Sequence, residues 1–236
     1  MSSRTNSAPK KMPNIMRAHD DIVARSQAID AEAGAALGGA TNALIEHLRA
    51  SGAVVQALTV DEPVPDFALP NAAGRRVALQ DVLRRGPAII AFCLGDWSPV
   101  CRLYVRTLGE IAAGAMSEGA TILVISPQKK SAPAPHPSAA ERIETLFDAD
   151  NRIARLFGLS WRVPAEIAEN FVASGIDIAA LNGTDIWELP LPATYVVGPD
   201  WLVRYAFVDA DIRRRPEPAE LLAILTRLVR ESRDAI

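Results

Sequence analysis

Two continuous apolar runs constrain the fold more than any other feature of the sequence. The first, PAIIAFCL, fills residues 87–94 and is bounded by Gly86 and Gly95. The second, ATILVIS, fills residues 120–126. Apolar runs of this length without polar alternation are typical of strands that are buried on both faces, as the strands of parallel sheets are. Both runs therefore predict central strands of one sheet.

The segment between the two runs has the pattern of a helix. Ser98 is a good N-cap and Pro99 a good first helical residue, because the cap hydroxyl satisfies a free backbone N–H and proline needs no partner there. Apolar residues then recur at helical spacing as far as Gly119, over about five turns. Strand, helix and strand together predict a right-handed βαβ unit.

The second half of the chain ends in a hairpin and a helix. A Pro-rich loop is predicted at 127–140, and a short strand and a short helix with an Asp150 cap follow at 144–158. Residues 159–189 are predicted to be an insertion with one helix near 164–174. Two strands at 193–208 lie around a turn at 198–200, with the second strand at the sheet edge, and an amphipathic helix follows at 216–232. A doubly wound fold would need a helix between the last two strands, where only a turn lies. The predicted class is therefore α/β, a thioredoxin-like fold of βαβ plus ββα with a central mixed sheet and helices on both faces.

The N-terminal quarter has a different character. Residues 1–12 are polar and rich in Ser, Lys and Pro, which predicts a disordered tail. Residues 13–57 predict a helical extension, with Gly38-Gly39 as a break between two helical segments. The thioredoxin-like domain is then expected over residues 58–232.

Composition excludes several classes of function. A net charge of −3 gives no basic surplus for nucleic acid or an anionic membrane. No stretch approaches the roughly 20 apolar residues that span a bilayer, and no signal-peptide pattern follows the basic N-terminus. With two cysteines in 236 residues, a reducing compartment is expected, so the predicted location is cytoplasmic. The run Arg213–Arg215 is interpreted as a solvated turn, and Asp209 and Asp211 as a solvated strand end.

Cys101 is the candidate reactive residue. With Ser98 as the cap, Cys101 lies in the first helical turn, where free backbone N–H groups and the helix dipole stabilise a thiolate. Helix N-termini with cationic neighbours lower a cysteine pKa from about 8.5 to about 3.5–7.5, and Arg102 and Arg106 are candidate cations. The alternative is a small buried hydrophobic residue, the commoner fate of a lone cysteine.

Cys93 is interpreted as a packing residue inside the first apolar run, where burial raises a thiol pKa. A disulfide needs two Cα atoms within about 7 Å of each other. With Cys93 in a strand and Cys101 in the first turn of the next helix, the sequence gives no indication that they lie so close. His19, His47 and His136 are dispersed, so neither a Cys-His dyad nor a metal site is predicted. Trp97 is equally compatible with lining the site and with packing.

Four segments carry a resemblance to a known family: VPDFALPNAAGRRVAL, FCLGDWSPVC, DADNRIARLFG and LPLPATYVVGPDWLVRYAFVDADIRRRPEP. Together, from about Leu58 to Leu228, they resemble the peroxiredoxin-like AhpC/TSA (alkyl hydroperoxide reductase and thiol-specific antioxidant) family. The branch that they resemble most has F-Y-R-G-x-W-C-P-Y-C at the active site, and Ser98 replaces its first cysteine. In better-known peroxiredoxins the motif is P-x-x-x-T/S-x-x-C, which places the peroxide-attacking cysteine on Cys101 and the hydroxyl on Ser98. The motif proline falls on Leu94 and the assisting arginine on Pro192.

The resemblance implies a thiol peroxidase that needs no cofactor. Cys101 would reduce hydrogen peroxide or an organic hydroperoxide, and an external thiol such as thioredoxin or glutathione would restore it. With Cys93 buried, a one-cysteine enzyme is expected, and a homodimer is one assembly to consider. Two alternatives stay open: a redox sensor or thiol-disulfide binding module without turnover, and an inert scaffold with a buried Cys101.

Overall fold

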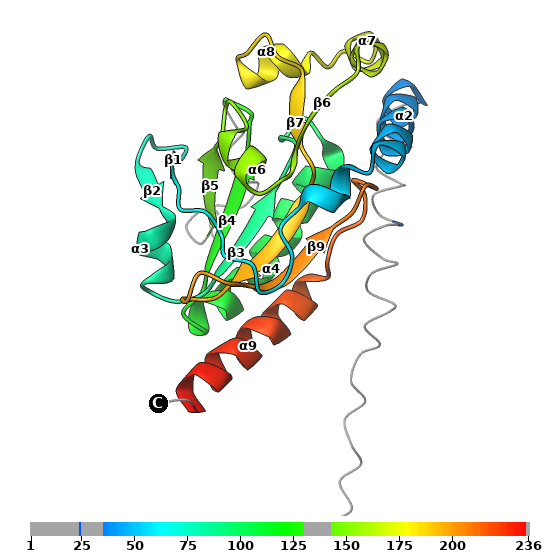
Figure 1. Cartoon of the computed structure of the whole chain (residues 1–236). Helices are drawn as coiled ribbons and strands as arrows, with labels where there is room; N and C mark the ends of the chain where they lie inside the picture. Colours follow the sequence, from blue (N-terminus) through cyan, green and yellow to red (C-terminus); the bar gives the residue numbers. More distant parts are fainter. Residues whose placement is uncertain (1–23, 25–34, 130–142, 235–236) are drawn as a thin grey trace, which may run out of the picture.

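The computed structural model describes residue 24, residues 35–129 and residues 143–234. Its centre is a five-stranded sheet in the order β5-β4-β3-β8-β9 (Figure 1). The strands are β3 (Ala88–Phe92), β4 (Thr121–Ser126), β5 (Ile143–Phe147), β8 (Ala193–Val197) and β9 (Val203–Val208). β3, β4 and β5 run parallel, whereas β8 and β9 are antiparallel to their neighbours. The predicted βαβ unit and the edge hairpin are both confirmed.

The two faces of the sheet are covered by different elements. Side chains alternate between faces along a strand, and Phe92 and Tyr195 point to the face on which Phe157 packs, at ring-centroid distances of 4.9 and 5.4 Å. Thr194 points to the other face and meets Tyr104 of α4 (Pro99–Ser117). α9 (Pro218–Asp234) packs against α4. Phe157 directly follows α6 (Arg152–Leu156), so helices lie on both faces, as predicted.

The remaining short elements surround the sheet. They are β1 (Ala68–Pro70), β2 (Arg76–Ala78), α3 (Leu79–Leu83), α6 (Arg152–Leu156) and the 3₁₀ helix η1 (Ala53–Gln56). β1 and β2 form an antiparallel pair whose turn is closed by Asn71 and Gly74, as the sequence indicates.

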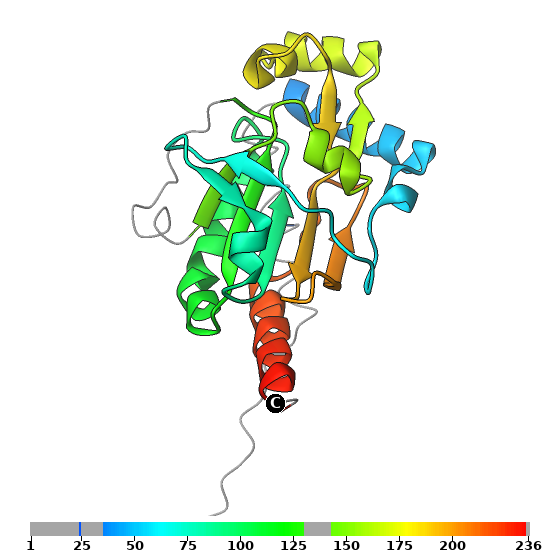
Figure 2. The same ribbon diagram turned by 60° about the vertical axis from the view of Figure 1, so that its left-hand side comes forward.

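The insertion contains more structure than the sequence predicts. It consists of β6 (Ser160–Arg162), α7 (Ala165–Ala173), α8 (Ile178–Asn182) and β7 (Glu188–Pro190), so the expectation of a single helix is wrong. Asp177 caps α8 by accepting a hydrogen bond from the N–H of Ala180. The helix after this cap has only five residues, so its apolar pattern is too short to be recognised in the sequence. Figures 1 and 2 show α7 and α8 grouped at one end of the molecule, away from α9.

The N-terminal extension packs on this insertion. α2 (Ala35–Ser51) lies against α7 and buries an apolar stripe that includes Leu37, Leu44 and Leu48. α2 runs through Gly38-Gly39, so the predicted break there is wrong. Glycine costs a helix about 1 kcal/mol, and burial of the stripe outweighs that cost. Residues 1–23 and 25–34 lie outside the described part, and the division into 1–12, 13–57 and 58–232 stays a prediction.

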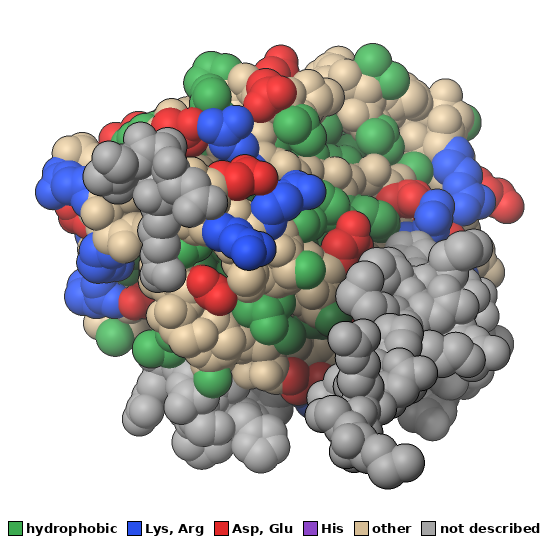
Figure 3. All heavy atoms as spheres, turned by 90° about the horizontal axis from the view of Figure 1, so that it is seen from below, with side chains coloured by type: hydrophobic (Ala, Val, Ile, Leu, Met, Phe, Trp, Pro, Cys, Tyr) green, Lys and Arg blue, Asp and Glu red, His purple; other side chains and the backbone are tan. Residues whose placement is uncertain are grey.

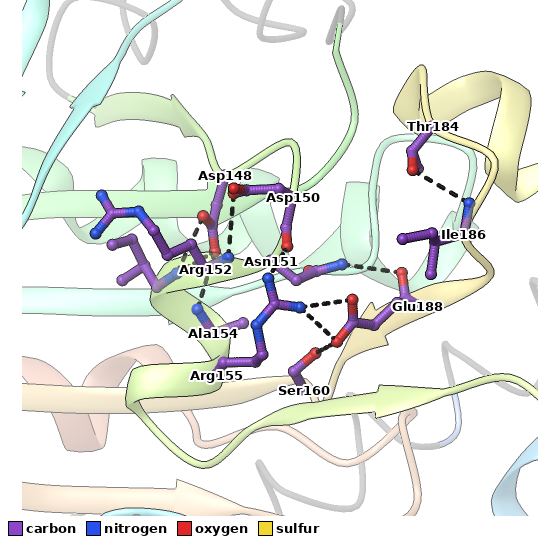
Figure 4. Close-up of polar contacts among 11 residues, drawn as sticks. Asp148, Asp150, Asn151, Arg152, Ala154, Arg155, Ser160, Thr184, Ile186 and Glu188 are labelled. Atoms are coloured by element: carbon purple, nitrogen blue, oxygen red, sulfur yellow. Dashed lines mark hydrogen bonds and ion pairs between the residues drawn. The ribbon is translucent and has the colours of Figure 1, made fainter.

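Polar contacts fasten the insertion to the core (Figure 4). The carboxylate of Asp148, rather than the predicted Asp150, accepts hydrogen bonds from the N–H groups of Ile153 and Ala154 at the start of α6. The carboxylate of Asp150 accepts from the N–H of Arg152 at 3.2 Å, and its carbonyl accepts from Nη2 of Arg155 at 2.6 Å. Nearby, the guanidinium of Arg155 contacts both carboxylate oxygens of Glu188 on β7, at 2.8 and 2.7 Å. These contacts fix the position of β6 and β7 relative to α6.

The surface carries charges of both signs. On the face seen in Figure 3, the visible Lys and Arg side chains lie among Asp, Glu and hydrophobic side chains. Over the described residues, no helix is both long and apolar enough to cross a membrane.

Candidate thiol site

Cys101 lies where the capping pattern predicts. Ser98 is the N-cap of α4, and its hydroxyl oxygen accepts a hydrogen bond of 3.4 Å from the N–H of Cys101. Pro99 is the first helical residue. The loop before the cap is held by Gln128, whose side-chain oxygen accepts from the N–H of Asp96 at 2.8 Å. The thiol of Cys101 therefore lies in the first turn of the helix, directly after its cap.

Cys93 lies beside Cys101, which the sequence analysis did not anticipate. β3 ends at Phe92, so Cys93 follows the strand instead of lying inside it, and its N–H donates to the carbonyl of Ile125 at 2.9 Å. Alternation along the strand turns Cys93 toward the face covered by α4. There its thiol forms a hydrogen bond with the sulfur of Cys101. Both cysteines are free thiols and only 2% exposed.

Arg215 supplies the positive charge of the site. Its Nη2 lies 3.9 Å from the sulfur of Cys101, its Nη1 donates to the carbonyl of Arg214 at 2.7 Å, and its guanidinium carbon lies 5.6 Å from the ring centroid of Tyr104. Arg215 is 1% exposed, so the interpretation of its run as a solvated turn is wrong for this residue. Arginine stays protonated in proteins, and a buried guanidinium is stabilised by a nearby anion.

The two sulfurs have opposite pKa shifts. The hydrogen bond from Cys93 is the largest cause that lowers the pKa of Cys101 to about 5; the charge of Arg215 and the hydroxyl of Ser98 also lower it, and burial opposes them. The pKa of Cys93 is raised well above its ordinary value, first by its hydrogen bond to Cys101 and then by burial. The site therefore holds one thiolate at neutral pH, on Cys101. The pKa of Cys101 is therefore lowered, as predicted, and Cys93 and Arg215 are two of the causes.

The predicted cations lie elsewhere. Arg102 and Arg106 are exposed on α4, and Arg102 donates to the carbonyl of Asp96. No local pattern distinguishes Arg215 from Arg213 and Arg214, because only the packed fold shows which of the three is buried. Arg215 is thus the site residue that sequence reasoning missed.

A polar network ties the segment before Arg215 to the N-terminal extension. The carboxylate of Asp211 accepts from Arg213 at 2.9 Å and from Arg49 of α2 at 3.2 Å. Arg213 also donates to the side chain of Asn42 at 3.1 Å. Burial raises the pKa of Asp211, but the hydrogen bonds and charge of Arg213 and the charge of Arg49 outweigh it and hold that pKa below its usual range.

The predicted solvated strand end is therefore wrong for Asp211, which is buried. Asp209 is half-buried and pairs with Arg214 at 2.7 Å. Its backbone partner is Asp211, whose N–H donates to the carboxylate of Asp209 at 2.8 Å. This short segment is ordered by its own carboxylates before the chain reaches Arg215.

Two aromatic residues of the loop and helix that carry Cys101 have defined partners. The hydroxyl groups of Tyr104 and Thr194 lie 2.9 Å apart, which joins α4 to β8 next to Arg215. Trp97 packs edge-on against Phe171 of α7, with ring centroids 5.5 Å apart. Trp97 thus packs between the site loop and the insertion.

No histidine joins the described site. His47 of α2 lies against the Trp161 ring, with centroids 6.1 Å apart, and His19 and His136 fall outside the described residues. In the described part of the chain, no group of three or more His, Cys, Asp or Glu side chains is arranged to hold a metal ion. The chemistry that the site offers is that of a buried thiolate next to a second thiol and a guanidinium.

Comparison with known proteins defines the class to which this fold and thiol site belong. The AhpC/TSA family model matches residues 60–206, more than half of the chain. The protein belongs to the AhpC/TSA family, and its thioredoxin-like fold is confirmed. No curated protein sequence matches the chain.

Similar solved structures include peroxiredoxins. Peroxidoxin BcpB from Mycobacterium tuberculosis is 19% identical with a TM-score of 0.54, over 72% of this chain and 98% of that one. The Plasmodium vivax 2-Cys peroxiredoxin is 13% identical with a TM-score of 0.55, over 75% and 84%. The yeast mitochondrial 1-Cys peroxiredoxin is 13% identical with a TM-score of 0.53, over 75% and 79%. At these identities the likeness shows the shared fold.

Proposed function

We propose that the protein is a thiol peroxidase in which Cys101 reduces hydrogen peroxide or an organic hydroperoxide. The thiolate sulfur attacks one peroxide oxygen, the O–O bond breaks, and the leaving oxygen takes a proton as water or alcohol. Cys101 becomes a sulfenic acid. The observation that carries this proposal is the depressed pKa of Cys101, to about 5, in contact with Arg215 and capped by Ser98.

Each neighbour has a role in this step. Ser98 caps the helix and directs its hydroxyl toward the thiolate. Arg215 replaces the assisting arginine of better-known peroxiredoxins, whose position falls on Pro192. Its guanidinium stabilises the thiolate before attack and the negative charge that develops on the leaving oxygen during attack. No cofactor takes part.

An external thiol closes the cycle. We propose a small or protein thiol of the glutathione or thioredoxin kind, since the yeast mitochondrial 1-Cys peroxiredoxin, which shares this fold, resolves its thiol via glutathione/thioredoxin systems. A reducing compartment such as the cytoplasm would keep both cysteines free, and a homodimer is one assembly in which the cycle could run.

A second candidate function is a redox sensor, in which oxidised Cys101 is read by a partner without turnover. The 2% exposure of Cys101 favours it, because a buried sulfur admits peroxide more readily than a bulky reductant. The two candidates differ in turnover. Steady-state peroxide consumption with dithiothreitol, glutathione or thioredoxin, compared with Cys101→Ser, tests them. We expect many turnovers per protein that are lost in Cys101→Ser. A single stoichiometric oxidation would favour the sensor.

A further inference from the structure

In the peroxide-attack step Cys93 forms and breaks no bond, although it is the second thiol of the site. The chain has two cysteines, and both are buried on the α4 side of β3. Their sulfurs are in hydrogen-bond contact, and Arg215 acts electrostatically on both. A thiol held against a sulfur that becomes a sulfenic acid is positioned to attack it.

Oxidation of Cys101 removes two of the three causes that raise the pKa of Cys93. Before oxidation, the hydrogen bond to Cys101 and the negative charge of Cys101 both raise the pKa of Cys93, while Arg215 lowers it. A neutral sulfenic acid carries no charge, so the Coulomb repulsion disappears and the demand for a hydrogen-bond donor is weakened. The positive charge of Arg215 remains. Burial still raises the pKa of Cys93, but that pKa is lower after Cys101 has reacted than before, so Cys93 is a better nucleophile at that stage.

The loop between the cysteines must move a short distance to close a bond. A disulfide needs an S–S distance of about 2.0 Å, shorter than a hydrogen-bond contact. The cap bond from the N–H of Cys101 to Ser98 is long, at 3.4 Å. The first turn of α4 is thus held weakly at the end that has to move.

The other side of the loop is held tightly. Gly95 has a φ of +143°, and a Cβ there would lie 2.5 Å from the side-chain oxygen of Gln128 and 2.7 Å from Trp97. Cys93 is anchored by its bond to Ile125. The movement is therefore expected at Cys101 and not at Cys93.

We propose that Cys93 is the resolving cysteine of this protein. Its sulfur attacks the Cys101 sulfur of the sulfenic acid, an intramolecular S–S bond forms, and the S–O bond breaks. The released hydroxide takes the proton from the former Cys93 thiol and leaves as water. An external thiol then reduces the disulfide in two exchange steps and is itself oxidised. This inference rests on the proposed peroxidase function and replaces the one-cysteine cycle expected from the sequence.

Peptide mapping tests the inference directly. Cleavage after Arg85 and Arg102 gives one peptide, residues 86–102, that contains both cysteines. Wild-type protein is treated with one equivalent of hydrogen peroxide and quenched with acid. It is then blocked with iodoacetamide in denaturant at about pH 8, where free thiols ionise, and digested without reductant. We expect the peptide to be two hydrogens lighter than the reduced form, with neither cysteine alkylated, and expect reductant to restore both alkylation sites.

The failures are distinguishable. A peptide with one added oxygen or a mixed disulfide on Cys101, together with an alkylated Cys93, would overturn the resolving role and leave the peroxidase proposal standing. A peptide joined to a second copy would overturn the intramolecular bond. If peroxide leaves both cysteines alkylatable, both proposals fail.

A variant gives an independent readout. In Cys93→Ser we expect Cys101 to be trapped as a sulfenic acid and to proceed to a sulfinic acid at about tenfold lower peroxide than in wild type. Equal sensitivity to overoxidation would contradict the proposal. Circular dichroism confirms that the variant folds, and the wild-type map decides the question if it does not.

Discussion

The end of β3 and the first turn of α4 present two equally buried sulfurs with opposite chemistry. Cys93 and Cys101 are each 2% exposed, yet the pKa of one rises and that of the other falls to about 5. Burial disfavours both thiolates, so it cannot separate them. The difference comes from donors: Cys101 receives hydrogen bonds from Cys93 and Ser98 and lies 3.9 Å from Arg215. Cys101 is the thiolate, and the thiol of Cys93 stabilises it as a hydrogen-bond donor.

Removing the thiol of Cys93 should have the largest effect on the difference between the two pKa values. In Cys93→Ala the Cys101 thiolate loses its strongest hydrogen bond, and a hydrogen bond to a charged group contributes about 1.5–3 kcal/mol. We expect the thiolate fraction at pH 5 to fall about tenfold, as measured by thiolate ultraviolet absorbance against the matching variant that also carries Cys101→Ser. Cys93→Ser, which keeps a donor, should lie between wild type and Cys93→Ala. Identical titrations of all three would contradict the assigned donor.

Removing the guanidinium should have the next largest effect. In Arg215→Leu, the loss of a cation beside Cys101 should reduce its thiolate fraction at pH 5 by about fivefold. Arg214→Leu is the matched control, because its exposed side chain pairs with Asp209 instead. Equal effects of the two substitutions would show that net charge, and not the position of Arg215, sets the pKa.

Ser98→Ala should have a smaller effect on reactivity and a measurable effect on stability. The lost cap should cost about 1 kcal/mol of unfolding free energy and lower the thiolate fraction at pH 5 about twofold. Urea unfolding and the thiolate titration measure the two effects. Trp97→Phe, next to the cap, is the control and should change the titration less. An unchanged titration and unfolding curve for Ser98→Ala would exclude both roles.

The smallest effect is expected at the network that positions Arg215. Asp211→Asn weakens the pairing with Arg213 and Arg49, so the segment that leads to Arg215 should become less fixed. We expect a decrease of about twofold or less in the thiolate fraction at pH 5. Asp81→Asn, which breaks an exposed ion pair with Arg84, should leave the titration unchanged. A larger effect at Asp81 than at Asp211 would contradict this positioning role.

The sequence predicts the local parts of the molecule and leaves out the contacts between distant segments. The apolar runs, the Ser98 cap and the strands are each indicated by a short stretch of neighbouring residues, and all are observed. Arg215 lies 114 positions from Cys101 and looks like its two neighbours, so only packing distinguishes it. The side of Cys93 could have been predicted, because alternation along residues 88–93 places it on the same face as Ala91, which the following helix covers.

The rate of reaction with hydrogen peroxide as a function of pH tests the central claim most directly. Trp97 packs beside the site loop and provides a fluorescence signal for stopped-flow measurements on the reduced wild-type protein. Because the pKa of Cys101 is lowered to about 5, the thiolate is present above that pH and lost below it. We expect the second-order rate constant to rise with a midpoint near pH 5, stay level through neutral pH, and vanish in Cys101→Ser. A rate that rises only near pH 8.5, as for an ordinary cysteine of pKa about 8.5, or that survives in Cys101→Ser, would contradict a reactive Cys101 thiolate.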